Sequence, residues 1–204
     1  MTGFGFSALI YNPYMDNYCL FDTGGDGKVL IHNINQFKVD IQNIKNIIIS
    51  HSHFDHSGGL SKILAKNPNI KVYVPIGNLN SFQPKYPQNK IIGVENLLRI
   101  EKGLISSGQI GKSIREQALI IKKDDDVFLI VGCTHPGLEN FILKAKEIGS
   151  LIGIIGGFHG FRKYSYLENI SIIGACHCTS HTKAIRKRYP NNFKQICVGD
   201  SISF

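Results

Sequence analysis

The stretch "IIISHSHFDHSGG", residues 47–59, decides how this chain is interpreted. It begins with a run of isoleucines, which is typical of a strand that is buried on both faces. Directly after that run, residues 51–56 contain three histidines and one aspartate. In open α/β sheets the functional crevice lies just beyond the carboxyl ends of the strands. The stretch therefore predicts a buried strand that ends in a functional site.

The spacing within this cluster favours metal binding. His51 and His53 are two residues apart, so in an extended chain both side chains point to the same side and can hold one cation. Asp55 and His56 follow where the chain turns into a helix, and they project at a different angle that suits a second cation. Imidazole nitrogen and carboxylate oxygen are the ligands expected for zinc or a similar metal. Ordinary surface histidines of a turn do not explain so dense a cluster.

The rest of the chain alternates apolar runs with amphipathic segments. Continuous β-branched runs such as "VFLIVGC" and "ISIIG" predict further strands that are covered on both faces. Helical periodicity is clearest in "PGLENFILKAKEIG", and it also predicts helices over "GGLSKILAKNP" and residues 182–189. Residues 76–115 are rich in proline, glycine and asparagine, which predicts a loop-rich flap or insertion over the site. We expect residues 1–204 to form a single domain.

Charge and cysteine content narrow the function classes. The net charge of +8 favours an anionic partner such as a phosphorylated small molecule. The densest basic run, residues 183–188, has no interleaved aromatic residues, which argues against a nucleic-acid groove. Five scattered cysteines without a signal peptide favour a reducing cytoplasm over a disulfide framework. No apolar run is long enough for a membrane span, so we expect no membrane insertion.

Several motifs give the chain a family resemblance. "HSHFDH" resembles the H-x-H-x-D-H signature of the metallo-β-lactamase superfamily, and "LFDTGGDG", residues 20–27, resembles its upstream strand and Asp-Thr-Gly motif. The resemblance continues through "REQALII", "VGCTHPG", "GGFHG" and "GACHCTSHTKA". This combination is similar to the branch related to archaeal dihydropterin ribofuranosylaminobenzene 5'-phosphate synthase. It implies an αββα sandwich, in which two mixed sheets are flanked by helices.

The resemblance also implies a ligand set for one or two divalent metal ions, zinc in the first place, with iron or manganese as alternatives. The residues that match ligands of the first metal are His51, His53 and His135. The residues that match ligands of the second metal are Asp55, His56 and His177. Asp22 matches a carboxylate behind the metals, where a fixed acceptor can orient a ligating histidine.

The chain departs from the family pattern at one place. The superfamily commonly bridges its two metals with an aspartate between the third and the last histidine motifs, and residues 137–175 contain no aspartate. His159, in "GGFHG", occupies the equivalent place, so we expect it at the site, as a ligand, a substrate contact or a mark of a single-metal centre. Cys133, Cys176 and Cys178 are expected to pack inward, away from the metals. Glu116 is expected to contact the substrate or to anchor the flap.

The resemblance implies a metal-dependent hydrolase that uses a metal-bound hydroxide on a phosphorylated or other anionic small molecule. Asp55 and His159 are the candidates for catalytic proton transfer. A second hypothesis is a pterin-diphosphate-dependent transferase that uses the same metal site. A third is a non-catalytic metal-binding module. The sequence leaves these alternatives open.

Overall fold

The first of two β-sheets holds the strand that precedes the histidine cluster. The computed structural model describes residues 1–204. The strand order of this sheet is β1-β2-β3-β4-β5, with β1 antiparallel to β2 and the others parallel. Its strands are β1 (Ala8–Asn12), β2 (Asn17–Phe21), β3 (Ile44–Ile48), β4 (Lys71–Pro75) and β5 (Lys90–Val94). The predicted strand over the isoleucine run is therefore β3 and its continuation, since Ile47, Ile48 and Ile49 are all fully buried.

The second sheet supplies the later histidines. Its order is β11-β10-β9-β8-β7-β6, with β9, β10 and β11 parallel and the hairpins from β6 to β9 antiparallel. Its strands are β6 (Leu98–Glu101), β7 (Leu104–Ser106), β8 (Leu119–Lys123), β9 (Asp126–Val131), β10 (Ser150–Gly157) and β11 (Ile172–Cys176). Both sheets are mixed, as expected.

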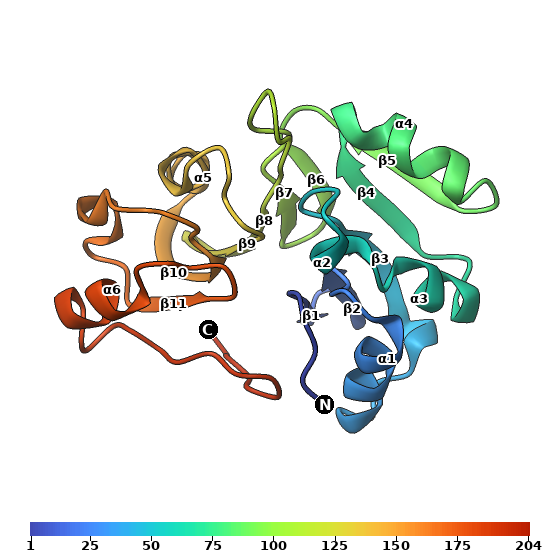
Figure 1. Cartoon of the computed structure of the whole chain (residues 1–204), viewed down its shortest axis with the longest axis horizontal. Coiled ribbons are helices and arrows are strands. Elements are labelled where there is room, and N and C mark those ends of the chain that lie inside the picture. The colour runs from blue at the N-terminus through green and yellow to red at the C-terminus, as the bar shows by residue number, and fades with distance from the viewer.

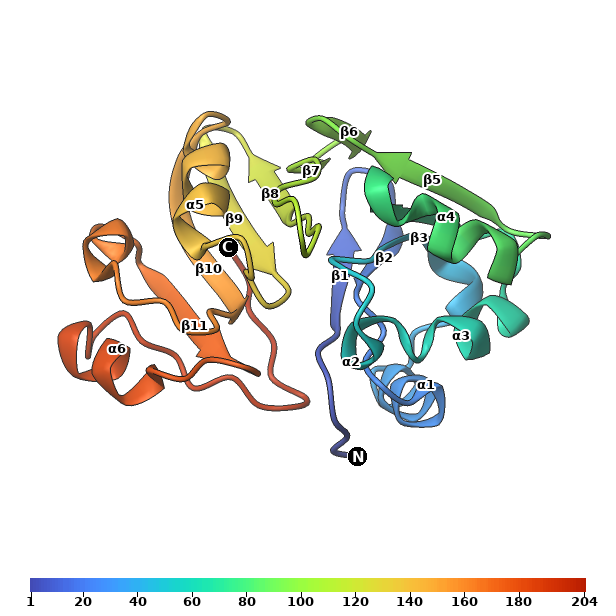
Figure 2. The same ribbon diagram turned by 45° about the horizontal axis from the view of Figure 1, so that its top comes forward.

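Helices cover the outer face of each sheet (Figures 1 and 2). The first sheet carries α1 (Gly27–Gln36), α3 (Leu60–Lys66) and α4 (Leu79–Phe82), and the second carries α5 (Leu138–Lys146) and α6 (Thr182–Arg188). A single short turn of helix, α2 (Phe54–Ser57), lies at the histidine cluster. Short 3₁₀ turns complete the chain: η1 (Ile41–Asn43), η2 (Ile76–Asn78), η3 (Gln83–Lys85) and η4 (Tyr164–Leu167). The αββα sandwich is thus confirmed, and no helix is both long and apolar enough to cross a membrane.

The three predicted helices form close to where periodicity placed them. α5 buries Leu138, Phe141, Ile142 and Ala145 on one face against the second sheet, and α3 ends before Pro68. α5 begins only after Gly137, later than the start of the predicted segment, because the φ of 103° at Gly137 breaks the helical path. Glycine adopts this conformation without the steric penalty that other residues meet.

Residues 76–115 differ from the expected loop-rich flap. They hold η2, α4 and η3, and then β5, β6 and β7, which belong to the two sheets. The prolines lie in η3 and the loop after it, while apolar segments such as "KIIGV" find pairing partners on neighbouring strands. β5 pairs with β4 across residues 76–89 and β7 pairs with β8 across residues 107–118, so local composition misses these pairings, while β6 and β7 form a short hairpin.

An apolar core between the sheets holds them face to face. It contains side chains from both sheets, among them Phe21, Ile48, Leu119 and Phe128. At the amino ends of β2 and β3, the side-chain amides of Asn12, Asn17 and Asn46 donate hydrogen bonds to the carboxylate of Glu101 on β6. Apolar packing and this polar contact thus link the two sheets.

Candidate metal centre

The predicted site residues follow the carboxyl ends of strands in both sheets. Asp22 follows β2, His51 lies just past β3, and His135, His159 and His177 follow β9, β10 and β11. The registers pair Phe21 with Ile48 in one sheet and Gly157 with Cys176 in the other, so these strands end level with their neighbours. Residues far apart in the chain therefore meet at one edge of the sandwich.

Several of these residues have a strained backbone conformation that sets the direction of their side chains. Asp22, Thr134, His159 and His177 have φ values between 43° and 60°, in the left-handed region that non-glycine residues seldom occupy. Each such residue costs about 1–2 kcal/mol relative to ordinary backbone. Clustering of this strain at one edge of the fold is typical of a functional site.

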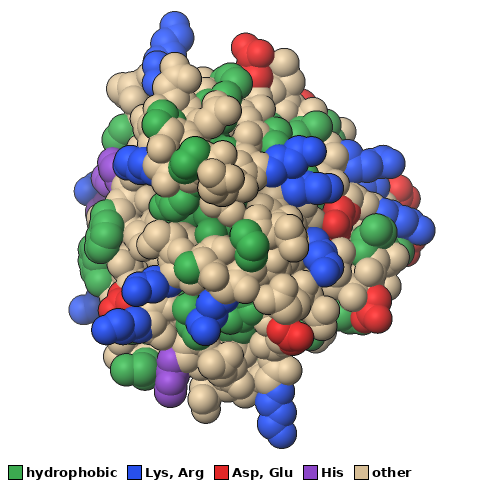
Figure 3. Space-filling model, turned by 90° about the vertical axis from the view of Figure 1, so that its right-hand side faces the viewer, with side chains coloured by type: hydrophobic (Ala, Val, Ile, Leu, Met, Phe, Trp, Pro, Cys, Tyr) green, Lys and Arg blue, Asp and Glu red, His purple; other side chains and the backbone are tan.

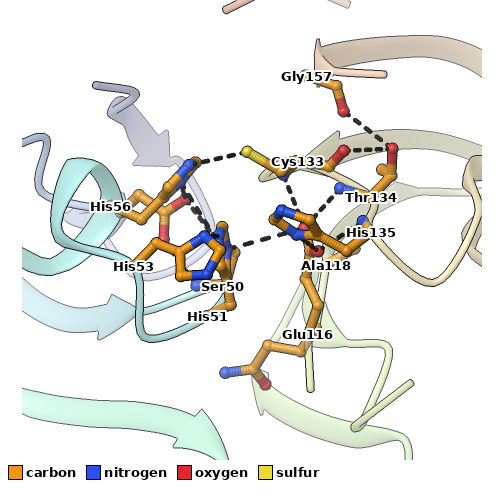
Figure 4. Close-up of polar contacts among 12 residues, drawn as sticks. Ser50, His51, His53, His56, Glu116, Ala118, Cys133, Thr134, His135 and Gly157 are labelled. Atoms are coloured by element: carbon orange, nitrogen blue, oxygen red, sulfur yellow. Dashed lines mark hydrogen bonds and ion pairs between the residues drawn. The ribbon is translucent and has the colours of Figure 1, made fainter. Parts of the chain in front are cut away.

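The first group of histidines is assembled from β3 and β9 (Figure 4). His51 Nε2 lies 3.1 Å from His53 Nδ1. The ring of His135 lies 4.8 Å from the His51 ring and 5.0 Å from the His53 ring, measured between centroids. His51 is fully buried, whereas His53 is exposed. The structure thus brings together the three residues expected around a first metal.

The second group joins α2 to the end of β11. His177 Nε2 lies 3.1 Å from His56 Nε2 and 3.1 Å from Asp55 Oδ2. Asp55 Oδ2 also lies 3.5 Å from His56 Nε2. Two imidazole nitrogens and a carboxylate oxygen thus point to one place, as expected for a second metal. This donor set suits zinc or a similar divalent ion.

Cys133 differs from its expected position. Its Sγ lies 3.1 Å from His56 Nε2, directed into the histidines rather than inward to the core (Figure 4). The alternation rule for extended chains fails here because the strand has ended and the backbone turns at Thr134, whose φ is 60°.

Burial and mutual repulsion keep the imidazoles of His51, His53 and His177 available as ligands. Burial lowers the pKa of His51 strongly, and the neighbouring His56 and His135 lower it further. Burial also lowers the pKa values of His53 and His177. A neutral imidazole offers a free nitrogen lone pair, so metal binding at neutral pH displaces few protons from these rings.

Asp22 lies behind His56, as predicted for a residue that orients a ligand. Its Oδ1 accepts a hydrogen bond of 2.6 Å from the backbone N–H of Ser50, and its Oδ2 accepts one of 2.7 Å from the Ser50 hydroxyl. His56 Nδ1 lies 2.7 Å from Oδ2. Burial alone would lower the pKa of His56, but the carboxylates around it, first Asp22 and then Asp55 and Glu116, together raise that pKa. Asp22 therefore holds a proton on Nδ1 and leaves Nε2 facing Asp55 and His177.

Replacing Asp22 with asparagine is expected to weaken metal binding about 10- to 100-fold, the usual effect of removing such a carboxylate. The Asn oxygen would keep the Ser50 N–H, so its NH₂ group would face His56 Nδ1 and shift the ring proton to Nε2. Competition with a chelator measures the change. Asp124→Asn is the matched control, because Asp124 has a similar φ of 53° but is exposed. Equal affinities of the two variants would contradict this role for Asp22.

Glu116 does not occupy the substrate-contact position considered from the sequence. Its side chain is fully buried, and its oxygens accept backbone hydrogen bonds from Cys133, Thr134 and His135 at 2.7, 2.8 and 3.0 Å. Glu116 Oε2 also lies 3.1 Å from His135 Nδ1. The Glu116 side chain thus anchors the loop that carries His135, while its backbone pairs with Ile110 in residues 76–115.

His159 lies at the rim. Its ring centroid is 5.1 Å from that of His135, and the residue is exposed. His53 Nδ1 lies 3.1 Å from His51 Nε2, whereas no nitrogen of the His159 ring makes such a contact with the other histidines. An exposed imidazole next to the groups fits a contact with substrate or a proton carrier better than a ligand.

Ser50 and Gly132 are site residues that sequence reasoning missed. Ser50 connects Asp22 to the histidines, since its hydroxyl also lies 2.9 Å from His51 Nδ1. A side chain at Gly132 would collide with Ser50 and would come within 2.9 Å of Glu116 Oε1. The sequence offered one signal for each: Ser50 directly precedes the histidine motif, and Gly132 directly precedes the Cys133 loop.

The chain that carries this arrangement is similar to known proteins. The family model described as the metallo-beta-lactamase superfamily matches residues 2–90, which include Asp22 and the whole histidine motif. The dihydropterin ribofuranosylaminobenzene 5'-phosphate synthase of Methanocaldococcus jannaschii is 22% identical over an alignment covering 99% of this chain and 90% of that protein. Residues 2–90 are therefore similar to the metallo-beta-lactamase superfamily.

Two further proteins extend the likeness. An uncharacterized protein of the same archaeon, MJ0448, is 29% identical over 97% of this chain and 92% of its own length. The crystal structure of Tm1679, described as a metal-dependent hydrolase of the beta-lactamase superfamily, superposes with a TM-score of 0.75 at 22% identity. That superposition covers 96% of this chain and 89% of Tm1679, so the sandwich as a whole is shared.

Proposed function

We propose that this protein is a metal-dependent enzyme that acts on a phosphorylated or other anionic small molecule. The observation that carries the proposal is the convergence of two groups of metal-binding side chains at one edge of the sandwich. His51, His53 and His135 would hold one divalent ion. The group that would hold a second contains Asp55, His56 and His177. Zinc fits this donor set best, with iron or manganese as alternatives.

Bound divalent ions at such a site lower the pKa of a coordinated water to about 7 and polarise a substrate oxygen. The residues of the chain supply the rest. Asp55, whose side chain is 18% exposed, and the exposed His159 can each take or give a proton at the open side of the centre. Asp22 and Glu116 keep His56 and His135 in place.

The charge of the protein favours an anionic substrate. The chain carries a formal charge of +8, and on the face over α1, α3 and α4 its lysine and arginine side chains are dispersed among acidic and apolar ones (Figure 3). Dispersed positive charge attracts small anions through a long-range field. A dianionic phosphate gains from this field and from two cations, whereas a neutral lactam gains little from either.

A substrate panel tests the proposal. We expect the metal-loaded protein to turn over a phosphomonoester or phosphodiester. In His53→Ala the rate should fall at least about 100-fold, since the loss of one electrostatic contact in an active site typically lowers the rate by a factor of about 10²–10³. Thioesters and lactams belong in the same panel. Metal-dependent turnover of thioesters or lactams alone would refute the phosphate proposal, and no turnover at all would favour a metal-binding module.

Transfer of a pterin group to an aminobenzene is the second candidate, because the M. jannaschii synthase is similar over nearly the whole chain. The two reactions can be distinguished by the conditions under which each product is released. A pterin-diphosphate-dependent transferase releases pyrophosphate only when an aromatic acceptor is present, whereas a hydrolase releases its leaving group without one.

A further inference from the structure

Cys133 is a buried thiol that none of the roles above uses. Its side chain belongs to both groups of converging donors, whereas His51, His56, His135, His177 and Asp55 each belong to one. Its Sγ lies within 4.8 Å of donor atoms of Asp55, His56 and His177, and equally of His51 and His135. Only 4% of the residue is exposed. No carboxylate occupies this shared position.

The fold itself directs the Cys133 side chain. The backbone N–H of Cys133 donates a 2.7 Å hydrogen bond to Glu116 Oε1. Gly132, just before it, packs so closely on Ser50 that a side chain there would collide. The backbone on both sides of Cys133 is thereby held, and Sγ points among His56, His51 and His135 (Figure 4). Its position is built by polar contacts that exist without a metal.

We propose that Cys133 is a metal ligand whose thiolate is shared by the two groups of histidines. The inference rests on the metal centre of the proposed function, but on no particular substrate. On binding, the thiol proton is released to solvent and the sulfur donates electron pairs to the cations. A soft thiolate favours zinc over manganese or magnesium, which prefer oxygen ligands.

Cys178 is the matched control. It also lies near the site, with its Sγ 3.8 Å from the backbone oxygen of Cys133, yet it belongs to neither group of converging donors. Replacing either cysteine with serine removes one sulfur and preserves the size of the side chain. A difference between the two variants therefore reports on ligation and not on cysteine content.

Cobalt(II) titration of the metal-free protein tests the inference. We expect wild type to bind cobalt with a near-ultraviolet sulfur-to-cobalt charge-transfer band, Cys178→Ser to keep the band, and Cys133→Ser to lose it. In the Cys133→Ser variant, the affinity for at least one equivalent of cobalt should also fall by more than about 10-fold. X-ray absorption of the zinc-loaded wild type, which needs no variant to fold, should show a sulfur neighbour at about 2.3 Å.

The outcomes separate two failures. Wild type that binds no metal would overturn both the proposed function and this inference. Wild type that binds metal without a sulfur signal, or a signal that persists in Cys133→Ser, would overturn the role of Cys133 and leave the histidine centre standing. A signal that disappears in Cys178→Ser alone would assign the sulfur to Cys178 and also refute the inference.

Discussion

Replacing Glu116 with alanine is expected to lower the free energy of unfolding by about 3–5 kcal/mol, even without metal. The carboxylate accepts hydrogen bonds from the backbone N–H groups of residues 133–135 in a fully buried place. Its removal leaves those donors without partners, and each buried unsatisfied donor costs about 1–3 kcal/mol before relaxation. Chemical denaturation of the metal-free protein measures the loss.

Two comparisons make the Glu116 result specific. Glu147→Ala removes an exposed carboxylate that pairs with Lys144 at 3.0 Å, and it should change stability by less than about 0.5 kcal/mol. Glu116→Gln keeps one acceptor oxygen, so its free energy of unfolding should lie between those of wild type and Glu116→Ala. A loss below about 1 kcal/mol in Glu116→Ala would mean that water replaces the carboxylate, and that the loop does not depend on this residue.

Replacing His53 with alanine is expected to weaken metal binding more than 100-fold, beyond the roughly 10- to 100-fold typical of residues behind the ligands. His53 Nδ1 lies 3.1 Å from His51 Nε2, so its ring supplies one side of the first group. Because His53 is exposed, the metal-free variant should keep its stability within about 0.5 kcal/mol. Elemental analysis after gel filtration, with chelator competition, measures the loss.

His32→Ala is the control for His53→Ala. His32 is an exposed histidine on α1, remote from the two groups. The control should retain the metal content and affinity of wild type. Full metal content in His53→Ala, or equal losses in both variants, would show that the exposed histidine does not contribute to the centre.

Local patterns predicted much of the fold. A strand buried on both faces needs continuous β-branched residues, and a helix packed on a sheet needs apolar residues every three or four positions. Both requirements are satisfied within short segments, so β3, α3 and α5 could be placed from the sequence. Strands β5 to β7 could not, because β5 and β7 pair with β4 and β8 across intervening segments and only the β6–β7 hairpin is local.

The sequence by itself determined which residues of the histidine motif can bind a metal, because ligand chemistry and two-residue spacing are local properties. Only the tertiary structure decided that Glu116 faces a loop and that Cys133 points among the histidines. Both outcomes depend on where β8, β9 and β3 come together, and on a left-handed backbone at Thr134. Such long-range contacts carry no signal in neighbouring residues, so the direction of a side chain beyond the end of a strand is set by the assembled fold.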